Sequence, residues 1–328
     1  MTQHYTDSIL EVRGLKKYFP IKTGVLKKTT GFVKAVDDIS FILRRGETLG
    51  LVGESGCGKS TVARCLMKLY DITQGDIYFN EKNIANFNHS ELLDYRMMVQ
   101  MIFQDPYASL NPRMRVKEII GEAIRVHGLS KNRSWKEDVK DLLNTVGLRE
   151  SHMARYPHEF SGGQRQRIGI ARALAMKPKL IIADEPVSAL DVSIQAQIIN
   201  LLDRLKDDFG LSYLIIAHDL AVVEHISDRI IVMYLGNIME TASDKDLYNQ
   251  PAHPYTRALL NAIPDVGGKK GGNQRMLLKG DVPSPINPPD GCCFHTRCPD
   301  MFSLCSREKP EMVEISKNHW VSCLKYKR

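Results

Sequence analysis

Residues 53–60 read Gly53-Glu54-Ser55-Gly56-Cys57-Gly58-Lys59-Ser60, and Thr61 follows them. The stretch matches the phosphate-binding loop pattern G-x-x-x-x-G-K-[ST] at every fixed position. The apolar run at 48–52 predicts a short buried strand before it, and residues 61–69 predict a helix behind it. A glycine-rich turn at a helix N-terminus points backbone N–H groups and the helix dipole toward an anion. We therefore expect a nucleoside triphosphate to bind here, with its phosphates held by Gly53, Ser55, Gly56, Cys57, Gly58, Lys59, Ser60 and Thr61.

Two acidic residues end a second apolar strand, where Leu180-Ile181-Ile182-Ala183 runs into Asp184 and Glu185. Strand-end carboxylates often only cap the next helix, but behind a phosphate loop they predict hydrolysis. Asp184 suits the water shell of Mg²⁺, for which the Ser60 hydroxyl is a further expected ligand. Glu185 suits accepting a proton from the attacking water. Lys59 is expected to reach the outer phosphates.

A second anion-binding turn lies at Phe160-Ser161-Gly162-Gly163-Gln164, just before a predicted helix. It offers free N–H groups and a small hydroxyl. One triphosphate does not need two such turns, so the second is expected to serve a site on another subunit. His218 follows a predicted strand and could bond a γ-phosphate, although a lone histidine at a strand end is more often structural.

Composition and charge narrow the class of protein. The 328 residues are 43% hydrophobic and 25% charged, which is ordinary for a globular protein. No apolar run approaches the roughly 18–20 residues of a membrane span, and residues 1–8 lack the features of a signal peptide. The net charge of +7 comes from scattered Lys and Arg, which indicates a solvated basic surface rather than a nucleic-acid groove. We expect a cytosolic chain, or one held at a membrane by partners.

The pattern along the chain predicts an α/β fold with a helical insertion at about 90–174 and a helix at 193–209. Residues 20–32 read as an exposed basic loop, and glycines and prolines at 264–290 predict a linker and an extended Pro-rich arm. Strands are predicted at 9–12, 35–42, 75–80, 179–183 and 212–217.

The motifs stand in the order found in the ATP-binding cassette (ABC) ATPases, which the chain resembles over residues 9–245. Ser161-Gly162-Gly163-Gln164 is similar to the family's signature sequence, with Phe160 where Leu is usual. Gln104 matches the residue that touches Mg²⁺, in a loop facing the transmembrane subunits. Asp191 ends a Ser188-Ala189-Leu190-Asp191 loop like the one that crosses the family's dimer interface, and His218 matches the switch histidine. Phe19 fits the adenine-stacking aromatic, with Tyr18 as the alternative.

The resemblance implies a P-loop NTPase (RecA-like) core with an antiparallel β subdomain at 1–92 and 176–245. A helical subdomain with the signature would occupy 93–175, and a small Cys-rich module 246–328. The resemblance also implies a head-to-tail dimer, in which each ATP lies between one chain's phosphate loop and the other's signature serine. ATP and Mg²⁺ are the implied ligands, and the implied catalytic residues are Lys59, Gln104, Glu185 and His218.

Beyond the cassette the chain resembles the oligopeptide/dipeptide importer ATPases, and most of all their second ATPase subunit. His253-Pro254-Tyr255-Thr256, Asn287-Pro288-Pro289 and Arg297-Cys298-Pro299 carry this resemblance. Such importers combine two different ATPases, on the cytoplasmic face of the membrane, with two permeases and an extracytoplasmic peptide-binding protein. The implied function is ATP hydrolysis coupled to peptide import. The alternative is a non-transport ABC-type ATPase that acts on nucleic acid or a soluble protein.

Five of the seven cysteines lie in the last 37 residues, which indicates one local site. Cys293 occupies a variable position of the subgroup, and the other four lack the C-x₂-C pairs of a zinc site. Four irregularly spaced thiolates can hold a [4Fe–4S] cluster, which the resemblance also implies. We expect such a cluster to staple a small tail without a core of its own, with zinc or reduced thiols as alternatives. Its expected ligands are Cys292, Cys298, Cys305 and Cys323.

Overall fold

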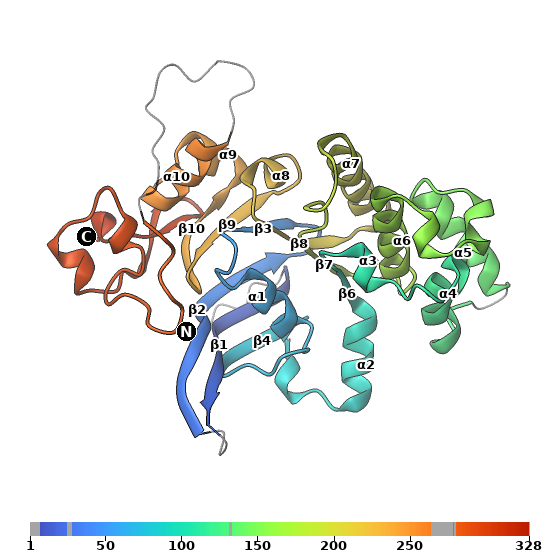
Figure 1. Cartoon of the computed structure of the whole chain (residues 1–328), viewed down its shortest axis with the longest axis horizontal. Coiled ribbons are helices and arrows are strands. Elements are labelled where there is room, and N and C mark those ends of the chain that lie inside the picture. The colour runs from blue at the N-terminus through green and yellow to red at the C-terminus, as the bar shows by residue number, and fades with distance from the viewer. Residues whose placement is uncertain (1–6, 25–27, 131–132, 264–277, 279, 328) are drawn as a thin grey trace. The chain divides into compact units, whose positions relative to one another are not determined.

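The computed structural model describes residues 7–24, 28–130, 133–263, 278 and 280–327. The chain divides into two compact units, and Figure 1 labels the longer helices and many of the strands. Residues 1–43, 48–85 and 217–328 form the first unit, and residues 44–47 and 86–216 form the second. Within the described ranges, no helix is both long and apolar enough to cross a lipid bilayer. The predicted linker glycines at 267–272 fall outside those ranges.

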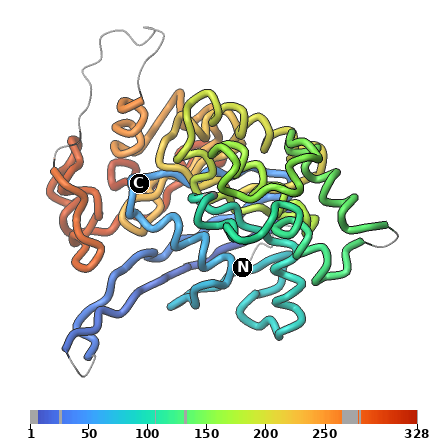
Figure 2. Tube along the Cα trace, turned by 45° about the vertical axis from the view of Figure 1, so that its right-hand side comes forward, coloured from blue at the N-terminus to red at the C-terminus, as the bar shows by residue number. Residues whose placement is uncertain are grey.

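The first unit opens with a sheet in the order β2-β1-β4-β5. The predicted loop at 20–32 is wrong, because the two N-terminal strands extend through most of it as one long hairpin (Figure 2). Side chains near the hairpin tip are mostly exposed. The sequence there therefore lacks the alternation of apolar and polar residues by which a half-buried strand is recognised. The strands are β1 (Ser8–Thr23), β2 (Lys28–Arg44), β4 (Gln74–Phe79) and β5 (Lys82–Asn83).

The predicted strand at 48–52 is confirmed as β3 (Thr48–Val52), and all five of its residues are buried. β3 pairs in parallel with β9, β9 pairs antiparallel with β10, and β12 joins β10 to β11. Burial on both faces explains why β3 is a continuous apolar run rather than an alternating one. These further strands are β9 (Arg229–Tyr234), β10 (Asn237–Ser243), β11 (Met312–Ser316) and β12 (His319–Ser322). The helices of the unit are α1 (Lys59–Leu66), α8 (Leu220–Glu224), α9 (Asp244–Asn249) and α10 (Pro254–Ala262).

The second unit contains a parallel sheet in which β7 pairs with β6 on one side and with β8 on the other. The two strands predicted here and the helix between them are confirmed. They are β7 (Leu180–Asp184), β8 (Ser212–Ala217) and α7 (Val192–Phe209). The sequence pattern does not predict β6 (Val99–Ile102), because its four residues lie inside a region of helical spacing.

Helices α4 (Val116–Val126), α5 (Trp135–Thr145) and α6 (Gly162–Leu174) form the predicted helical region of the second unit. In α4 the buried residues Ile119, Ile120 and Ile124 lie three, four and eight positions after the buried Val116, so they form one apolar face.

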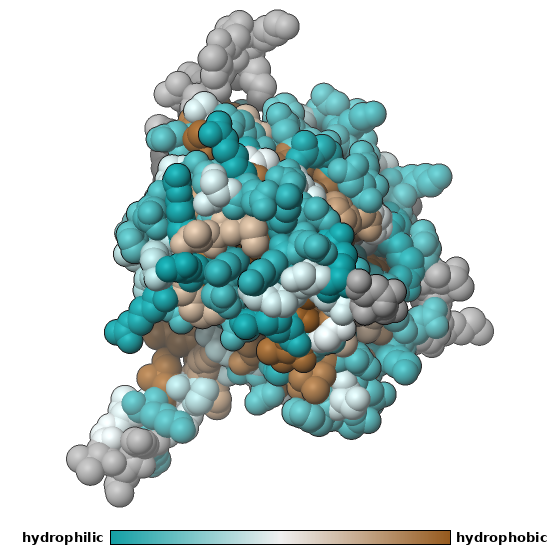
Figure 3. Space-filling view, turned by 90° about the vertical axis from the view of Figure 1, so that its right-hand side faces the viewer, coloured by the Kyte–Doolittle hydropathy of each residue, from teal (hydrophilic) through white to brown (hydrophobic). Residues whose placement is uncertain are grey.

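The side of the molecule seen in Figure 3 has a mainly hydrophilic surface. Shorter elements of the chain are η1 (Ile84–Asn86), α2 (His89–Met98), α3 (Pro106–Ser109), η2 (Glu150–Ala154) and η3 (Pro157–Glu159).

The C-terminal region packs into the first unit rather than standing alone. Phe294 has no exposed surface, and its ring centroid lies 5.2 Å from that of Tyr234 and 5.3 Å from that of Tyr255. In addition, β12 extends the sheet beside β10. A tail fixed in this way needs no separate core. Its short helical turns are η4 (His295–Arg297), η5 (Ser303–Ser306) and η6 (Leu324–Tyr326).

A buried carboxylate ties these segments together. Glu240 of β10 accepts hydrogen bonds from the N–H groups of Ala252 and His253 at 2.8 Å each, and its Oε1 lies 2.7 Å from His319 Nε2. Burial raises the pKa of Glu240, but its hydrogen bonds, led by that from His319, leave the pKa below its usual value. Next along the chain, His253 Nδ1 accepts the N–H of Tyr255 at 3.0 Å and so caps α10. Burial lowers the pKa of His253 to about 4.

Candidate functional site

The phosphate loop joins β3 to α1, as the sequence predicts, although α1 begins two residues earlier than expected, at Lys59. Two of its glycines are required by close backbone contacts. A Cβ on Gly53 would lie 2.0 Å from the Met233 carbonyl oxygen, and a Cβ on Gly58 would lie 2.1 Å from that of Ala35. Both have positive φ, 156° and 106°, which favours glycine. The loop is therefore held between β2 and β9.

The Lys59 ammonium lies over its own loop. Lys59 is 4% exposed, and its Nζ donates to the carbonyl oxygens of Gly53 at 2.7 Å and Glu54 at 3.0 Å. Its Nζ also lies 3.6 Å from Cys57 Sγ, and burial raises the pKa of that thiol. Ser55 and Gly56 are exposed at the tip of the loop, while Ser60 and Thr61 are half-buried in the first turn of α1. This is a concave, cation-bearing turn suited to a phosphate.

The two aromatic candidates for adenine stacking differ in their surroundings. The Tyr18 hydroxyl donates to Asp37 of β2. Phe19 packs edge-on against Tyr70, with ring centroids 5.3 Å apart, and the Lys17 ammonium lies 4.8 Å from the Phe19 ring. Both residues are half-buried near the end of β1. The Tyr18 side chain is thus fixed by a hydrogen bond to a neighbouring strand, whereas Phe19 makes ring contacts.

In the second unit the structure brings Glu185 and Gln104 together. Gln104 Nε2 donates to Glu185 Oε2 at 2.8 Å. Asp184 is 3% exposed at the end of β7. Glu185 adopts a left-handed φ of 46°, and its N–H donates to the Ile216 carbonyl at 2.9 Å. Such a conformation costs a non-glycine residue roughly 1–3 kcal/mol.

The signature turn also lies in the second unit, at the N-terminus of α6. Ser161 and Gln164 form a capping box, in which Gln164 Oε1 accepts the Ser161 N–H at 3.1 Å and Ser161 Oγ accepts the Gln164 N–H at 3.4 Å. A Cβ on Gly163 would lie 2.5 Å from an Ile194 side-chain carbon of α7, so that helix leaves no room for a side chain. Ser161 and Gly162 remain accessible at the surface. Asp191 is exposed at the start of α7 and makes no side-chain cap hydrogen bond.

The predicted site residues divide between the units. The phosphate loop, Tyr18, Phe19 and His218 belong to the first unit. His218 is exposed in the turn between β8 and α8. Gln104, Asp184, Glu185, Ser161, Gly162, Gly163, Gln164 and Asp191 belong to the second.

Sequence reasoning misses the contacts that two residues, Arg297 and Tyr255, make with Glu54 of the phosphate loop. Arg297 forms two hydrogen bonds with the Glu54 carboxylate, and the Tyr255 hydroxyl accepts the Glu54 N–H. No local signal predicts these contacts, because Arg297 lies 243 positions from Glu54.

The C-terminal cysteines are all free thiols. Burial raises the pKa of Cys292, and the nearby Cys305 and Cys323 raise it further. Burial likewise raises the pKa of Cys298 to about 11, with Cys292 and Cys323 adding to the effect. These four thiols are therefore neighbours, yet across the described ranges no three His, Cys, Asp or Glu side chains are grouped closely enough to hold a metal ion. The geometry does not support the expected iron–sulfur cluster, nor its zinc alternative.

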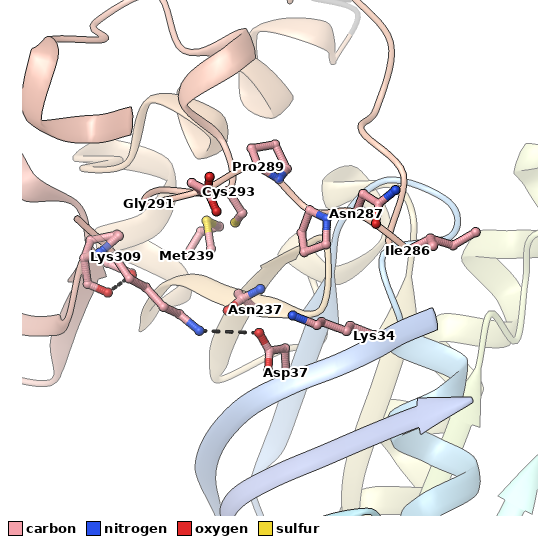
Figure 4. Close-up of a pocket in the computed structure, with 14 residues that line it drawn as sticks. Lys34, Asp37, Asn237, Met239, Ile286, Asn287, Pro289, Gly291, Cys293 and Lys309 are labelled. Atoms are coloured by element: carbon pink, nitrogen blue, oxygen red, sulfur yellow. Dashed lines mark hydrogen bonds and ion pairs between the residues drawn. The ribbon is translucent and has the colours of Figure 1, made fainter. Parts of the chain in front are cut away.

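Cys293 lines a cavity of about 440 Å³ in the first unit. Figure 4 shows Lys34 and Asp37 of β2, Met239 of β10 and Lys309 around this cavity. Lys309 Nζ lies 3.5 Å from Asp37 Oδ2, and burial raises the pKa of Cys293 to about 12. None of the predicted nucleotide-binding residues lines the cavity.

Comparison with known proteins gives two family matches. One family, described as ABC transporter, matches residues 36–188, and the oligopeptide/dipeptide transporter C-terminal region matches residues 239–305. The oligopeptide transport ATP-binding protein AppF of Bacillus subtilis (strain 168) is 54% identical, over 99% of this chain and 100% of that protein. The oligopeptide transport ATP-binding protein OppF of Haemophilus influenzae is 51% identical, over 97% of each.

Solved structures show the same fold. The ATP-binding cassette MJ0796, as a dimer in a post-hydrolysis state bound to ADP and Pi, is 26% identical with a TM-score of 0.62, covering 71% of this chain and 98% of that one. The resemblance inferred from the motifs is thus confirmed. The chain belongs to the ABC transporter ATPases, and it contains the C-terminal region of the oligopeptide/dipeptide transporters.

Proposed function

We propose that this chain is an ATP-hydrolysing subunit of an importer for di- or oligopeptides. The observation that carries the proposal is the combined match: an ABC transporter cassette followed by the C-terminal region of oligopeptide/dipeptide transporters. Relatives named as oligopeptide transport ATP-binding proteins align along nearly the whole chain. The partners follow from this function. They are two permeases, an extracytoplasmic peptide-binding protein and a homologous second ATPase, with this chain on the cytoplasmic face of the membrane.

The first unit is proposed to bind the nucleotide. Backbone N–H groups of the phosphate loop and the N-terminus of α1 receive the phosphates. The Lys59 ammonium donates hydrogen bonds to the carbonyl oxygens of Gly53 and Glu54 in this structure. It is proposed to move from these oxygens to the outer phosphate oxygens when ATP binds. Phe19 is proposed as the adenine-stacking residue in preference to Tyr18, because the Tyr18 hydroxyl is bound to Asp37. His218 is proposed to bond the γ-phosphate.

The second unit is proposed to supply the hydrolytic groups. Glu185 accepts the proton of the attacking water, and the hydrogen bond from Gln104 at 2.8 Å fixes its carboxylate. Ser60, Gln104 and Asp184 carry oxygens of the kind that Mg²⁺ prefers. When bound, Mg²⁺ neutralises charge on the phosphate oxygens.

The signature turn is proposed to act on a nucleotide bound by another ATPase subunit. Its accessible Ser161 and Gly162 stand at a helix N-terminus, which is favourable for an anion. Asp191 is proposed to lie at the same interface. We infer that the dimer is a heterodimer with a related chain, as in importers with two ATPases.

The iron–sulfur cluster expected from Cys292, Cys298, Cys305 and Cys323 is not part of the proposed mechanism, because the described residues do not present a metal-binding group. Iron, sulfide and zinc analysis of anaerobically purified protein tests it directly. Four iron and four sulfide per chain would establish the cluster, and their absence would leave four free thiols.

ATP-dependent peptide uptake tests the proposed function. The complex purified with this chain is placed in proteoliposomes with ATP inside the compartment that the chain faces, and labelled peptide is supplied on the other side. We expect uptake with the wild-type chain and none with Lys59→Ala. Equal uptake by both would overturn the assignment of the phosphate loop, and salt-sensitive binding to nucleic acid without any uptake would favour a non-transport ATPase.

A further inference from the structure

The geometry points to Arg297 and Tyr255 as positioning residues, through which the C-terminal region sets the affinity of the phosphate loop for ATP. The inference rests on the proposed binding of ATP at residues 53–60. It adds a function to the C-terminal region that its family match does not assign. Neither residue belongs to the phosphate-binding motif, and both act through Glu54.

The first contact is a bidentate ion pair. Arg297 Nη1 lies 2.7 Å from Glu54 Oε2, and Arg297 Nη2 lies 3.1 Å from Glu54 Oε1. The Arg297 side chain is 7% exposed and that of Glu54 is 26% exposed, so solvent screens the pair only in part. The hydrogen bonds to Glu54 raise the pKa of Arg297 above its usual value. Two parallel hydrogen bonds fix direction as well as distance.

The second contact holds the backbone of the same residue. The Tyr255 hydroxyl accepts the N–H of Glu54 at 2.9 Å. Tyr255 has no exposed surface, and its ring packs against those of Tyr234 and Phe294, with centroid distances of 4.8 and 5.3 Å. A tyrosine fixed in this way cannot follow the loop if the loop moves. Side chain and main chain of Glu54 are thus both anchored to the C-terminal region.

Glu54 matters because of its place in the loop. It follows Gly53, and the Lys59 ammonium bonds the carbonyl oxygens of both residues. A displacement of Glu54 therefore displaces the resting position of the lysine proposed to bind the phosphates. Glu54 also puts a negative charge into a loop that must attract a triphosphate. The positive charge of Arg297 lies directly beside the Glu54 carboxylate and compensates its negative charge, which an uncharged partner could not do.

A double-mutant cycle on purified full-length protein tests the inference. ATP affinity is measured by equilibrium titration with a fluorescent ATP analogue, and KM and kcat are measured in the assembled transporter. Arg297→Gln leaves the Glu54 carboxylate unpaired beside the phosphates, and we expect it to weaken ATP binding about tenfold or more. Glu54→Gln removes the charge itself and should weaken binding less. The double variant should bind ATP more tightly than Arg297→Gln alone.

The expected kinetic signature is a raised KM for ATP with kcat within about twofold of wild type, because the affected residues bind and do not react. Tyr255→Phe removes a single oxygen and should raise KM by a smaller factor. Arg307→Gln replaces an exposed arginine of the same region and is the matched control, with no expected change.

The outcomes separate this inference from the proposed function. If Arg297→Gln binds ATP as wild type does, or if the effects of Glu54→Gln and Arg297→Gln are additive, the positioning role is overturned. If Lys59→Ala retains full ATP affinity, the loop is not the nucleotide site and the proposed function fails first. Should Arg297→Gln not fold, Glu54→Gln combined with Tyr255→Phe still tests the contact, and wild-type KM in that double variant would refute it.

Discussion

Replacing Phe294 with alanine is expected to release residues 280–327 from the rest of the first unit. The ring has no exposed surface and contacts three other rings, with centroid distances of 5.2 Å to Tyr234, 5.3 Å to Tyr255 and 5.5 Å to His253. Truncation of a buried phenylalanine costs about 3–5 kcal/mol. Each well-formed aromatic pair adds about 0.5–1.5 kcal/mol beyond the area it buries. We therefore expect the free energy of unfolding of this region to fall by about 4 kcal/mol.

The loss of stability can be measured in the C-terminal region itself. β12 pairs with β10 at Glu240 and Thr241, so hydrogen exchange of the β12 amides reports the opening of the C-terminal region. Exchange of these amides should accelerate about 1,000-fold in the variant, as expected for a loss of about 4 kcal/mol. Amides of β7, which lies in the second unit, should exchange as in the wild type.

Phe302 provides the matched control, because it lies in the same region and is 38% exposed. Phe302→Ala should change the stability by less than about 0.5 kcal/mol. A loss below about 1 kcal/mol for Phe294→Ala would refute the account of how the tail is held. A larger destabilisation of wild-type protein by a chelator than by this substitution would show that a bound metal does the holding instead.

Two other changes have defined outcomes. Gly58→Ala places a Cβ 2.1 Å from the Ala35 carbonyl oxygen at a φ of 106°, and it should weaken ATP binding in an equilibrium titration at least about tenfold. Gly56→Ala is the control and should weaken binding less, because its Cβ would meet nothing within 4 Å. Equal losses of affinity in the two variants would contradict the proposed contact at Gly58. The pKa of His253, about 4 when folded, lies below its unfolded value of about 6.5, so the unfolded chain takes up the proton first as pH falls, and stability present above pH 6.5 is lost toward pH 4. Between pH 7 and pH 5, protonation of His253 should lower the free energy of unfolding by about 2 kcal/mol. His253→Asn keeps an acceptor for the N–H of Tyr255 and should remove this pH-dependent loss, as measured by urea unfolding at the two pH values. An unchanged pH dependence in the variant would contradict the assignment.

The sequence predicts best where one local pattern determines both structure and chemistry. Residues 48–61 predict strand, turn and helix together, because only glycine tolerates the approach of the Met233 and Ala35 carbonyls at Gly53 and Gly58. β7 is predicted equally well, since a short apolar run ending in carboxylates has few alternatives. The contact between Gln104 and Glu185 spans 81 positions, and no local pattern predicts it.

Prediction fails where long-range contacts override the local pattern. The hairpin of β1 and β2 reads as a loop, because Lys22, Gly24 and Lys28, near its tip, are basic residues and a glycine that are all exposed. The cysteine pattern suggests a metal staple, whereas in the structure the buried ring of Phe294 fixes the tail through its contacts with Tyr234 and Tyr255. The pair Arg297–Glu54 depends on packing across 243 positions, and no periodicity or spacing marks it.

ATP turnover by Glu185→Gln tests the central claim most directly. The amide oxygen of glutamine can still accept the Gln104 hydrogen bond, but it cannot take up the proton of the attacking water. Wild type and variant are compared in the assembled transporter, with ATP binding and single-turnover hydrolysis measured on the same samples. We expect ATP affinity within about twofold of wild type and hydrolysis slower by at least about 100-fold. Hydrolysis at the wild-type rate would contradict the assignment of Glu185 as the general base, and with it the proposed mechanism of this ATPase.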